Sequence, residues 1–502
     1  MAASNPAALL KDADEAIARN DPREAIRIYK TFLSQHRSHP RVLRVRSRVV
    51  TLYTRLGEYD EAVAVGERAG AGVEKDIDLL YAIAQANMYG GRLRQATETL
   101  ERCLAVDPDH AASIARMAVV LMSQKRADEA LKTVEAAWAR GIETWDLDHV
   151  FAQLAPGAAR VGEAIDRLRV RVDEPGLTPA ARSGVSMALA TLLEKEGDYA
   201  GSWAAAVRAN RIVRTGWNAD LHRQGLDETI AAYSADAFDA MAPIMESVEP
   251  RDRLVFVVGM PRSGTTLIDQ VLSAHPGAES VGESRCLELA AASVRLETPD
   301  PRVLARLTGA KRSAAGAALR ASMGAITGTD GVLIDKTPFN DRRVGALASF
   351  APGARIIITR RDPRDTALSC FFRNFASGME WSADMGWITE IIRERMRLHA
   401  HWLGVLPAHA PWVSVTQARY ESLVSEAEPQ ARRLVEFAGL PWDDACLRFS
   451  ERKRMLPTLE PGQAGQGVYT GSVARWRRFE PHAEGAFDAL HAIAEELGYE
   501  PA

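Results

Sequence analysis

The segment that decides the fold is PRDRLVFVVGMPRSGTTLIDQVLSAHP, residues 250–276. It begins with the apolar run Leu254–Val258, which is typical of a buried strand, passes through a glycine-containing turn and continues as an amphipathic helix. Three further apolar runs, separated by helical stretches, follow at 331–334, 355–359 and 412–416. Strands that alternate with helices predict a parallel sheet covered on both faces. We therefore expect an α/β domain over residues 251–502.

The turn after the first strand, Gly259-Met-Pro-Arg-Ser-Gly-Thr-Thr266, predicts a phosphate-binding loop. Strand, loop and helix in this order aim backbone N–H groups and a helix N-terminus at an anion. Both glycines and Thr266 fit the nucleotide P-loop pattern, but Thr265 stands where that pattern has lysine. Because that lysine contacts the β- and γ-phosphates, a kinase or nucleoside triphosphatase is disfavoured. Arg262 supplies instead a planar cation suited to a tetrahedral oxyanion.

The first two hundred residues carry an internal repeat of 34 residues. Two columns of residues keep this spacing: Gly57, Gly91 and Lys125, and Ala62, Ala96 and Ala130. Each copy has the pattern of a helix, a short polar turn and a second helix that starts near the alanine. The period and layout resemble the tetratricopeptide repeat, clearly over about 8–140 and loosely over 141–215. This resemblance predicts an α-solenoid over 1–215, whose concave face binds a protein or peptide partner, and a helical linker over 216–250.

Composition disfavours several other classes of protein. The 62 basic and 66 acidic residues give a net charge of −4, without the basic surplus that nucleic acid or anionic membranes require. The 4 cysteines are scattered, and no histidine pair has metal-ligand spacing, so no metal site is predicted. Residues 1–18 lack a signal-peptide pattern, and no apolar run is long enough to span a bilayer. We expect no nucleic-acid partner, no membrane span and a cytoplasmic location.

The loop sequence PRSGTT after an apolar strand resembles the 5′-phosphosulfate loop of sulfotransferases, enzymes that use 3′-phosphoadenosine 5′-phosphosulfate (PAPS). A second motif of that family, an arginine at a strand end with a serine eight residues later, is matched by Arg361 and Ser369. The resemblance implies that these two residues hold the 3′-phosphate. Arg373 is expected on the same helical face and at the same phosphate. The loop residues implied to bind PAPS are Pro261, Arg262, Ser263, Gly264, Thr265 and Thr266.

The closer resemblance is to tyrosylprotein sulfotransferases and their bacterial repeat-fused relatives. In HPGAESVGESR it implies Glu283 as the general base on the acceptor hydroxyl, if partial burial strengthens that base, and Arg285 as a clamp on an acidic acceptor. Lys336 in IDKTPFN is implied to stabilise charge on the bridging oxygen, so that Lys336 and Arg262 replace a metal. Tyr420 is expected near the adenosine. Arg475, in GSVARW, is expected in a loop that closes over the nucleotide.

Two hypotheses stay open at this point. The first is a PAPS-dependent sulfotransferase built as an α-solenoid followed by a P-loop-like α/β domain with a central parallel sheet, in which the repeats present the acceptor. The second is a scaffold that has lost catalysis and binds partners through the repeats. Glu460 and Gly465 favour the second, because relatives usually carry a serine and often an arginine there. The acceptor is equally open: a peptidyl tyrosine, another protein or peptide hydroxyl, a glycan, a lipid or a small molecule.

The candidate site residues have alternative roles as well. Lys336 and Arg285 are also compatible with structural ion pairs, Tyr420 with a core position, and Glu283 with a helix cap or an exposed carboxylate.

Overall fold

The computed structural model describes residues 5–19, 21–248, 253–294, 307–329, 331–375, 378–449 and 470–500. The chain divides into two compact units, residues 1–176 and the described part of residues 177–502. All elements of the first unit are helices, and the second contains five parallel strands, so the predicted solenoid and parallel-sheet domain are confirmed. Within the described ranges, no helix is both long enough and apolar enough to cross a membrane.

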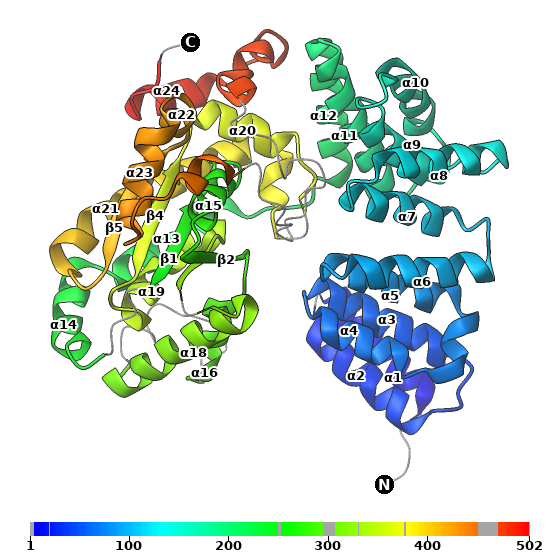
Figure 1. The fold of residues 1–502 in the computed structure, drawn as a ribbon, viewed down its shortest axis with the longest axis horizontal. Coiled ribbons are helices and arrows are strands. Elements are labelled where there is room, and N and C mark those ends of the chain that lie inside the picture. The colour runs from blue at the N-terminus through cyan, green and yellow to red at the C-terminus, as the bar shows by residue number, and fades with distance from the viewer. Residues whose placement is uncertain are drawn as a thin grey trace. The chain divides into compact units, whose positions relative to one another are not determined.

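Antiparallel helix pairs build the first unit, and Figure 1 shows them stacked along the chain. The pairs are α1 (Pro6–Ala18) with α2 (Pro22–Gln35), α3 (Val42–Arg55) with α4 (Tyr59–Glu67), α5 (Ile77–Tyr89) with α6 (Leu93–Val106), α7 (Ala111–Ser123) with α8 (Ala127–Ala139), and α9 (Trp145–Leu154) with α10 (Val161–Val172). A short 3₁₀ helix, Gly70–Lys75, connects α4 to α5. Each pair buries its apolar stripe against the next, which is how a repeat array forms a continuous core.

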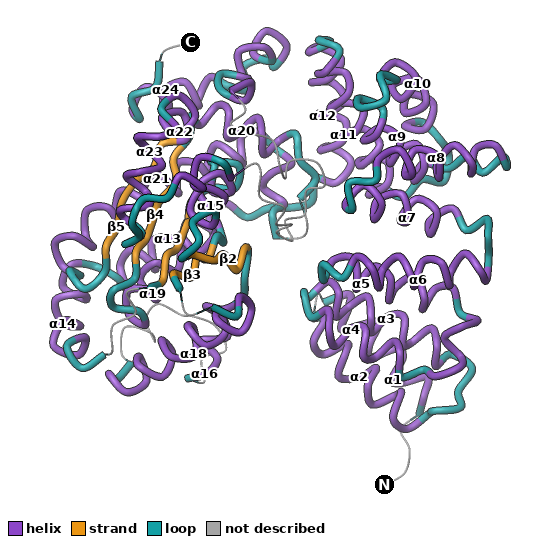
Figure 2. The backbone as a smooth tube through the Cα atoms, viewed as in Figure 1, coloured by secondary structure: helices purple, strands orange, loops and turns teal. Residues whose placement is uncertain are grey.

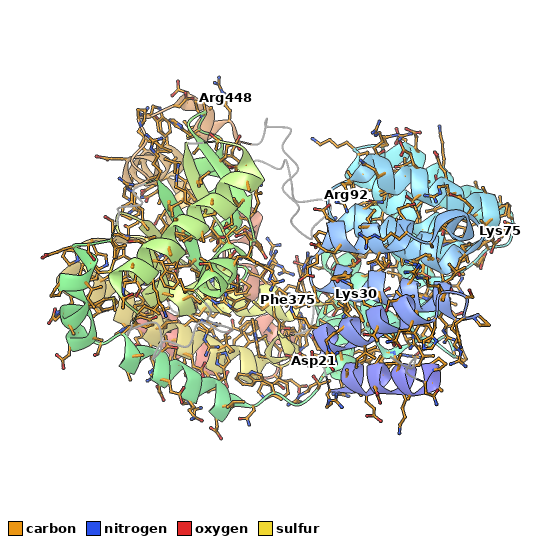
Figure 3. The ribbon with its side chains drawn as sticks, turned by 90° about the horizontal axis from the view of Figure 1, so that it is seen from below. Asp21, Lys30, Lys75, Arg92, Phe375 and Arg448 are labelled. Carbon is orange, nitrogen blue, oxygen red and sulfur yellow. The ribbon has the colours of Figure 1, made fainter. Side chains whose placement is uncertain are left out.

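The two columns of the 34-residue repeat have separate structural roles. The turn column adopts the left-handed conformation, with φ of +74° at Gly57, +73° at Gly91 and +62° at Lys125. That conformation ends the first helix of each pair and reverses the chain. The small-residue column, Ala62, Ala96 and Ala130, is fully buried, which lets the paired helices approach closely. Arg92, labelled in Figure 3, then ties neighbouring pairs together through the Tyr59 carbonyl at 3.1 Å.

A single five-stranded sheet lies at the centre of the second unit, as the orange strands in Figure 2 show. The strands are β1 (Leu254–Gly259), β2 (Ala278–Gly282), β3 (Val332–Asp335), β4 (Arg355–Arg360) and β5 (Ser414–Arg419), in the order β2-β3-β1-β4-β5. Every neighbouring pair is parallel. Four of these strands are predicted from the sequence. Strand β2 is not, because AESVG is short and too polar to stand out as an apolar run.

Helices cover both faces of this sheet. The helices of the second unit are α11 (Pro179–Lys195), α12 (Tyr199–Val213), α13 (Ala219–Ala232), α14 (Ala235–Met245), α15 (Thr265–Ser273), α16 (Cys286–Ser293), α18 (Gly309–Thr327), α19 (Val344–Phe350), α20 (Pro363–Phe371), α21 (Met385–His409), α22 (Tyr420–Ser425), α23 (Ala427–Phe437) and α24 (Asp488–Glu496). Strand β1 shows the two faces clearly: Phe256 packs into one core with α14 and α18, and Val257 into another with α15 and α23.

The helices before the sheet also belong to the second unit. The repeat pattern assigns α11 and α12 to the solenoid, yet they lie in the second compact unit. Helices α13 and α14, predicted as a linker, contribute Leu226, Phe238 and Met241 to the core that covers one sheet face. The sequence-based boundaries at residues 215 and 250 stay a prediction.

Candidate active site

Three neighbouring strands end at the same edge of the sheet and deliver the candidate residues there. Strand β1 leads into the predicted phosphate loop, β3 is followed at once by Lys336, and β4 by Arg361. These strands are adjacent and parallel, so their carboxyl ends meet at one edge. In open α/β sheets ligands bind at this edge, where the strand order reverses direction.

The loop between β1 and α15 needs glycine at two positions. Gly259 has φ of +146°, and a Cβ there would lie 2.3 Å from Thr359 Oγ1. Gly264 has φ of +100°, and a Cβ there would lie 2.5 Å from a ring carbon of Tyr420. Because Gly264 is also the N-cap of α15, it places no side chain over the amides of the first turn. This exposed helix start is the feature that an anion-binding loop requires.

Ser263 has a structural role in this loop. The residue is 3% exposed, and its Oγ donates to the Met260 carbonyl at 2.6 Å and lies 2.5 Å from Thr359 Oγ1. The hydroxyl therefore holds the loop against β4 by hydrogen bonding. Pro261 and Thr265 are also buried, whereas the side chain of Thr266 is exposed. Thr359 was not predicted, because its contact partner is far away along the chain.

The predicted 3′-phosphate residues contact the loop directly. Arg262 has φ of +67°, and its Nε donates to Ser369 Oγ at 2.9 Å. Arg361 Nη1 donates to the Arg262 carbonyl at 2.9 Å. The Arg361 side chain is 7% exposed, and its buried Nε has no partner among the described residues. The structure thus brings two cations and a hydroxyl together, with one buried donor still unused.

A C-terminal segment, residues 472–476, lies against these cations. Arg361 Nη2 donates to the Ser472 carbonyl at 2.6 Å, and the Tyr420 hydroxyl lies 2.7 Å from Ser472 Oγ. The guanidinium carbon of Arg361 lies 4.8 Å from the centre of the Tyr420 ring. Asp365 accepts from the backbone N–H groups of residue 474 at 2.7 Å and residue 476 at 3.0 Å. Burial raises the pKa of Asp365 to about 6.

Two predicted nucleotide contacts have surroundings that the sequence did not indicate. Helix α20 ends at Phe371, so Arg373 lies beyond the helix and does not share its face with Ser369; the helical-face argument for Arg373 is wrong. Arg475 forms an ion pair with Glu194 of α11, with two contacts of 2.5 Å. Neither Glu194 nor Asp365 was singled out from the sequence, because the partner of each lies far along the chain.

The predicted base and its neighbouring lysine form an ion pair. Lys336 is 1% exposed, and its Nζ donates to Glu283 Oε1 at 2.6 Å. The Glu283 side chain is 53% exposed, so the partial burial that the base hypothesis invoked is weak here. Arg285 lies nearby as the exposed N-cap of α16. Beneath this pair, Asp335 accepts from Ser284 Oγ at 2.5 Å, and burial raises the pKa of Asp335 to about 6.

Other catalytic chemistries have little support near the loop. Cys370 Sγ lies 3.6 Å from the Pro261 carbonyl, but burial raises the pKa of this thiol to about 12, which makes it a poor nucleophile. In the part of the chain that the structure describes, no cluster of three or more His, Cys, Asp or Glu side chains is placed to hold a metal ion. Glu460 and Gly465 lie outside the described residues.

The fold and the site together define a class: an α/β domain with a phosphate-loop geometry and a cluster of cations at the carboxyl edge of a parallel sheet. Residues 255–444 match the sulfotransferase family, and residues 10–72 and 87–141 match tetratricopeptide repeats. The chain therefore joins tetratricopeptide repeats to a domain of the sulfotransferase family.

Three of the proteins to which this chain is similar match it over different shares of its length. An uncharacterized protein of Aquifex aeolicus (strain VF5) is 28% identical over 349 residues, covering 67% of this chain and 45% of that protein. Protein-tyrosine sulfotransferase 1 of Danio rerio is 29% identical over 209 residues, covering 39% of this chain and 56% of that protein. The chain thus spans about half the length of each. The sulfotransferase domain of the Synechococcus PCC 7002 olefin synthase aligns with a TM-score of 0.34 at 19% identity, over 51% of this chain and 98% of that domain.

Proposed function

We propose that this protein is a sulfotransferase that takes its sulfuryl group from PAPS and transfers it to an acceptor hydroxyl, with a peptidyl tyrosine as the first candidate. The observation that carries the proposal is the contact chain at the sheet edge, in which Ser369, Arg262 and Arg361 are joined at 2.9 Å per step. These contacts link the phosphate loop to the Arg361–Ser369 motif, about a hundred residues later in the sequence. The protein-tyrosine sulfotransferases among its relatives support the choice of acceptor.

The residues at the edge fit a nucleotide that carries two separate anionic groups. The start of α15 offers backbone N–H groups to one anion, and the buried Nε of Arg361, without a partner among the described residues, can serve a second. The ring of Tyr420 packs against Gly264, where a base or sugar can lie beside the loop. When bound, PAPS supplies a sulfuryl group whose bond to the 5′-phosphate oxygen breaks as the bond to the acceptor oxygen forms.

The chain's own residues supply charge stabilisation and proton removal. Lys336 and Arg262 place positive charge at the edge, where negative charge develops on the leaving oxygen and the sulfuryl oxygens. Glu283 accepts the proton of the acceptor hydroxyl, for which its second carboxylate oxygen can serve, since Lys336 donates to Oε1. Arg285 is exposed beside this pair and is placed to attract an acidic acceptor segment. The repeats hold the rest of the acceptor, by the general role of such arrays.

The test combines binding with transfer. Calorimetry of the full chain with 3′,5′-phosphoadenosine, the product nucleotide, measures the cofactor site alone. Transfer of ³⁵S from labelled PAPS to a tyrosine peptide, compared with the same peptide carrying phenylalanine, measures the acceptor. Binding and tyrosine-dependent transfer are expected. Binding without transfer to any peptide, glycan or phenol would refute the tyrosine acceptor, and failure to bind would refute the use of PAPS.

A further inference from the structure

The helix pair α11–α12 is joined to the C-terminal segment by a bidentate ion pair. Glu194, near the end of α11, accepts from Arg475 Nε and Nη2 at 2.5 Å each. The two side chains are 18% and 19% exposed. The guanidinium carbon also lies 5.0 Å from the centre of the Phe372 ring and 5.4 Å from that of Phe479. A bidentate ion pair that is largely shielded from water fixes the positions of its two side chains more strongly than an exposed surface pair does.

The same helix pair contacts α20, the helix that carries Ser369. Asn210 on α12 is 3% exposed, and its Nδ2 donates to the Phe371 carbonyl at 2.8 Å, where α20 ends. Trp203 stacks on the Phe371 ring, with centroids 5.1 Å apart and an interplanar angle of 29°. Helix α12 therefore fixes one end of α20, while α11 fixes Arg475.

Arg475 lies inside the segment that contacts the cations of the site. The N–H groups of the residues on either side of it, 474 and 476, are held by Asp365. Three residues before Arg475, the carbonyl of Ser472 accepts from Arg361. A displacement at Arg475 is therefore transmitted over a few backbone bonds to the group that orients the Arg361 guanidinium.

We infer that Glu194 is a positioning residue for the nucleotide site, acting through Arg475 on residues 472–476 and so on Arg361. This inference rests on the proposed function, because it concerns the same nucleotide. It gives Arg475 the role of a tether for the segment. It also makes α11, a helix with the repeat pattern, a structural part of nucleotide binding.

The first experiment is a double-mutant cycle on the full chain, with calorimetric binding of 3′,5′-phosphoadenosine. Glu194→Gln and Arg475→Gln are each expected to raise the Kd about tenfold, since either one removes the same partly buried charged contact. The double variant is expected to bind no more weakly than the weaker single variant, because contacts that act as one unit are not additive. Glu196→Gln, an equal charge change at an exposed position at the end of the same helix, is the control and is expected to leave the Kd unchanged.

A second readout does not depend on the nucleotide. Hydrogen exchange of the backbone amides at 474 and 476 is expected to be faster in Glu194→Gln than in wild type, while exchange in the sheet is unchanged. In turnover, the KM for PAPS is expected to rise with little change in kcat. If Glu194→Gln does not fold, as thermal unfolding will show, Glu194→Asp replaces it, because it keeps the charge and is expected to give a smaller loss of the same kind.

Several outcomes would overturn the inference. An additive double variant, about a hundredfold weaker than wild type, would mean that Glu194 does not act through Arg475. An unchanged Kd together with unchanged exchange at 474 and 476 would mean that the ion pair does not position the segment. In both cases wild type still binds the nucleotide, so the proposed function stands. If wild type itself does not bind 3′,5′-phosphoadenosine, the proposed function fails and this inference fails with it.

Discussion

Replacing Arg361 by alanine tests the site at a residue that contacts both the phosphate loop and residues 472–476. The guanidinium donates to the carbonyls of Arg262 at 2.9 Å and Ser472 at 2.6 Å, and its buried Nε has no hydrogen-bond partner in the part of the chain that the structure describes. The side chain is only 7% exposed. A phosphate bound there would form a charge-assisted hydrogen bond that is largely shielded from water.

The size of the effect follows from this burial. Truncating one partner of a buried, hydrogen-bonded charge pair costs about 2–5 kcal/mol, so the Kd of 3′,5′-phosphoadenosine is expected to rise roughly 30- to 5,000-fold. The carbonyls of Arg262 and Ser472 also lose a donor. Each carbonyl that is left without a donor lowers the free energy of unfolding by about 1–3 kcal/mol if no water replaces the lost contact. Thermal unfolding of the variant must therefore be measured beside its binding.

Calorimetry on wild type, Arg361→Ala and Arg360→Ala separates the possible causes. Arg360 is the preceding residue, but its guanidinium donates to the Leu497 carbonyl and to Gln417 Oε1 instead of the loop. Arg360→Ala is expected to bind within about threefold of wild type, a difference below 1 kcal/mol. If folded Arg361→Ala binds as tightly as wild type, Arg361 does not hold a phosphate and our assignment of the site is incorrect. Equal losses in both variants would indicate a general effect of removing charge.

Three other changes probe separate parts of the chain. Lys336→Met is expected to lower kcat for sulfuryl transfer about 100- to 1,000-fold while changing nucleotide affinity little, because the lysine stabilises developing charge; an equal loss of affinity would contradict this. Burial raises the pKa of Asp365 to about 6 in the folded protein, whereas the pKa of this group in the unfolded chain is near 4. Asp365 therefore makes the free energy of unfolding fall by about 3 kcal/mol as pH rises from 4 to 6. Denaturant unfolding of Asp365→Asn should lack this pH-dependent fall. Lys125 is exposed and has φ of +62°, a conformation that strains a residue with a Cβ. Lys125→Gly should therefore stabilise the repeat unit by about 1 kcal/mol in thermal unfolding. A destabilised variant would show that the backbone at Lys125 is not strained.

Features that depend on local pattern could be predicted from the sequence. The turn and alanine columns repeat every 34 residues, and both keep one structural role throughout. The apolar runs that become β1, β3 and β4 are continuous because those strands are buried on both faces. The phosphate loop follows from the order of strand, glycines and helix. These signals lie within one or two elements, so a single sequence contains them.

Features that depend on distant contacts could not be predicted in this way. Helix α20 ends at Phe371 without glycine or proline, and the carbonyl there is bound by Asn210 from another helix, so the position of Arg373 was misjudged. Glu194 and Asp365 look like ordinary surface carboxylates until the segment at 472–476 folds against them. Helices α11 and α12 have the repeat pattern, but their packing partners decide that they belong to the second unit.

The order of the strands also has a consequence for how the chain folds during synthesis. Each helix pair of the first unit contacts mainly its neighbours in sequence, so the repeats are expected to fold soon after they leave the ribosome. Strand β1 must wait for β3 and β4, which are made much later, before its two edges are paired. Residues 472–476 are made later still. The nascent chain is therefore expected to hold a folded repeat unit and a sheet with its phosphate loop before Arg361 acquires its last partner.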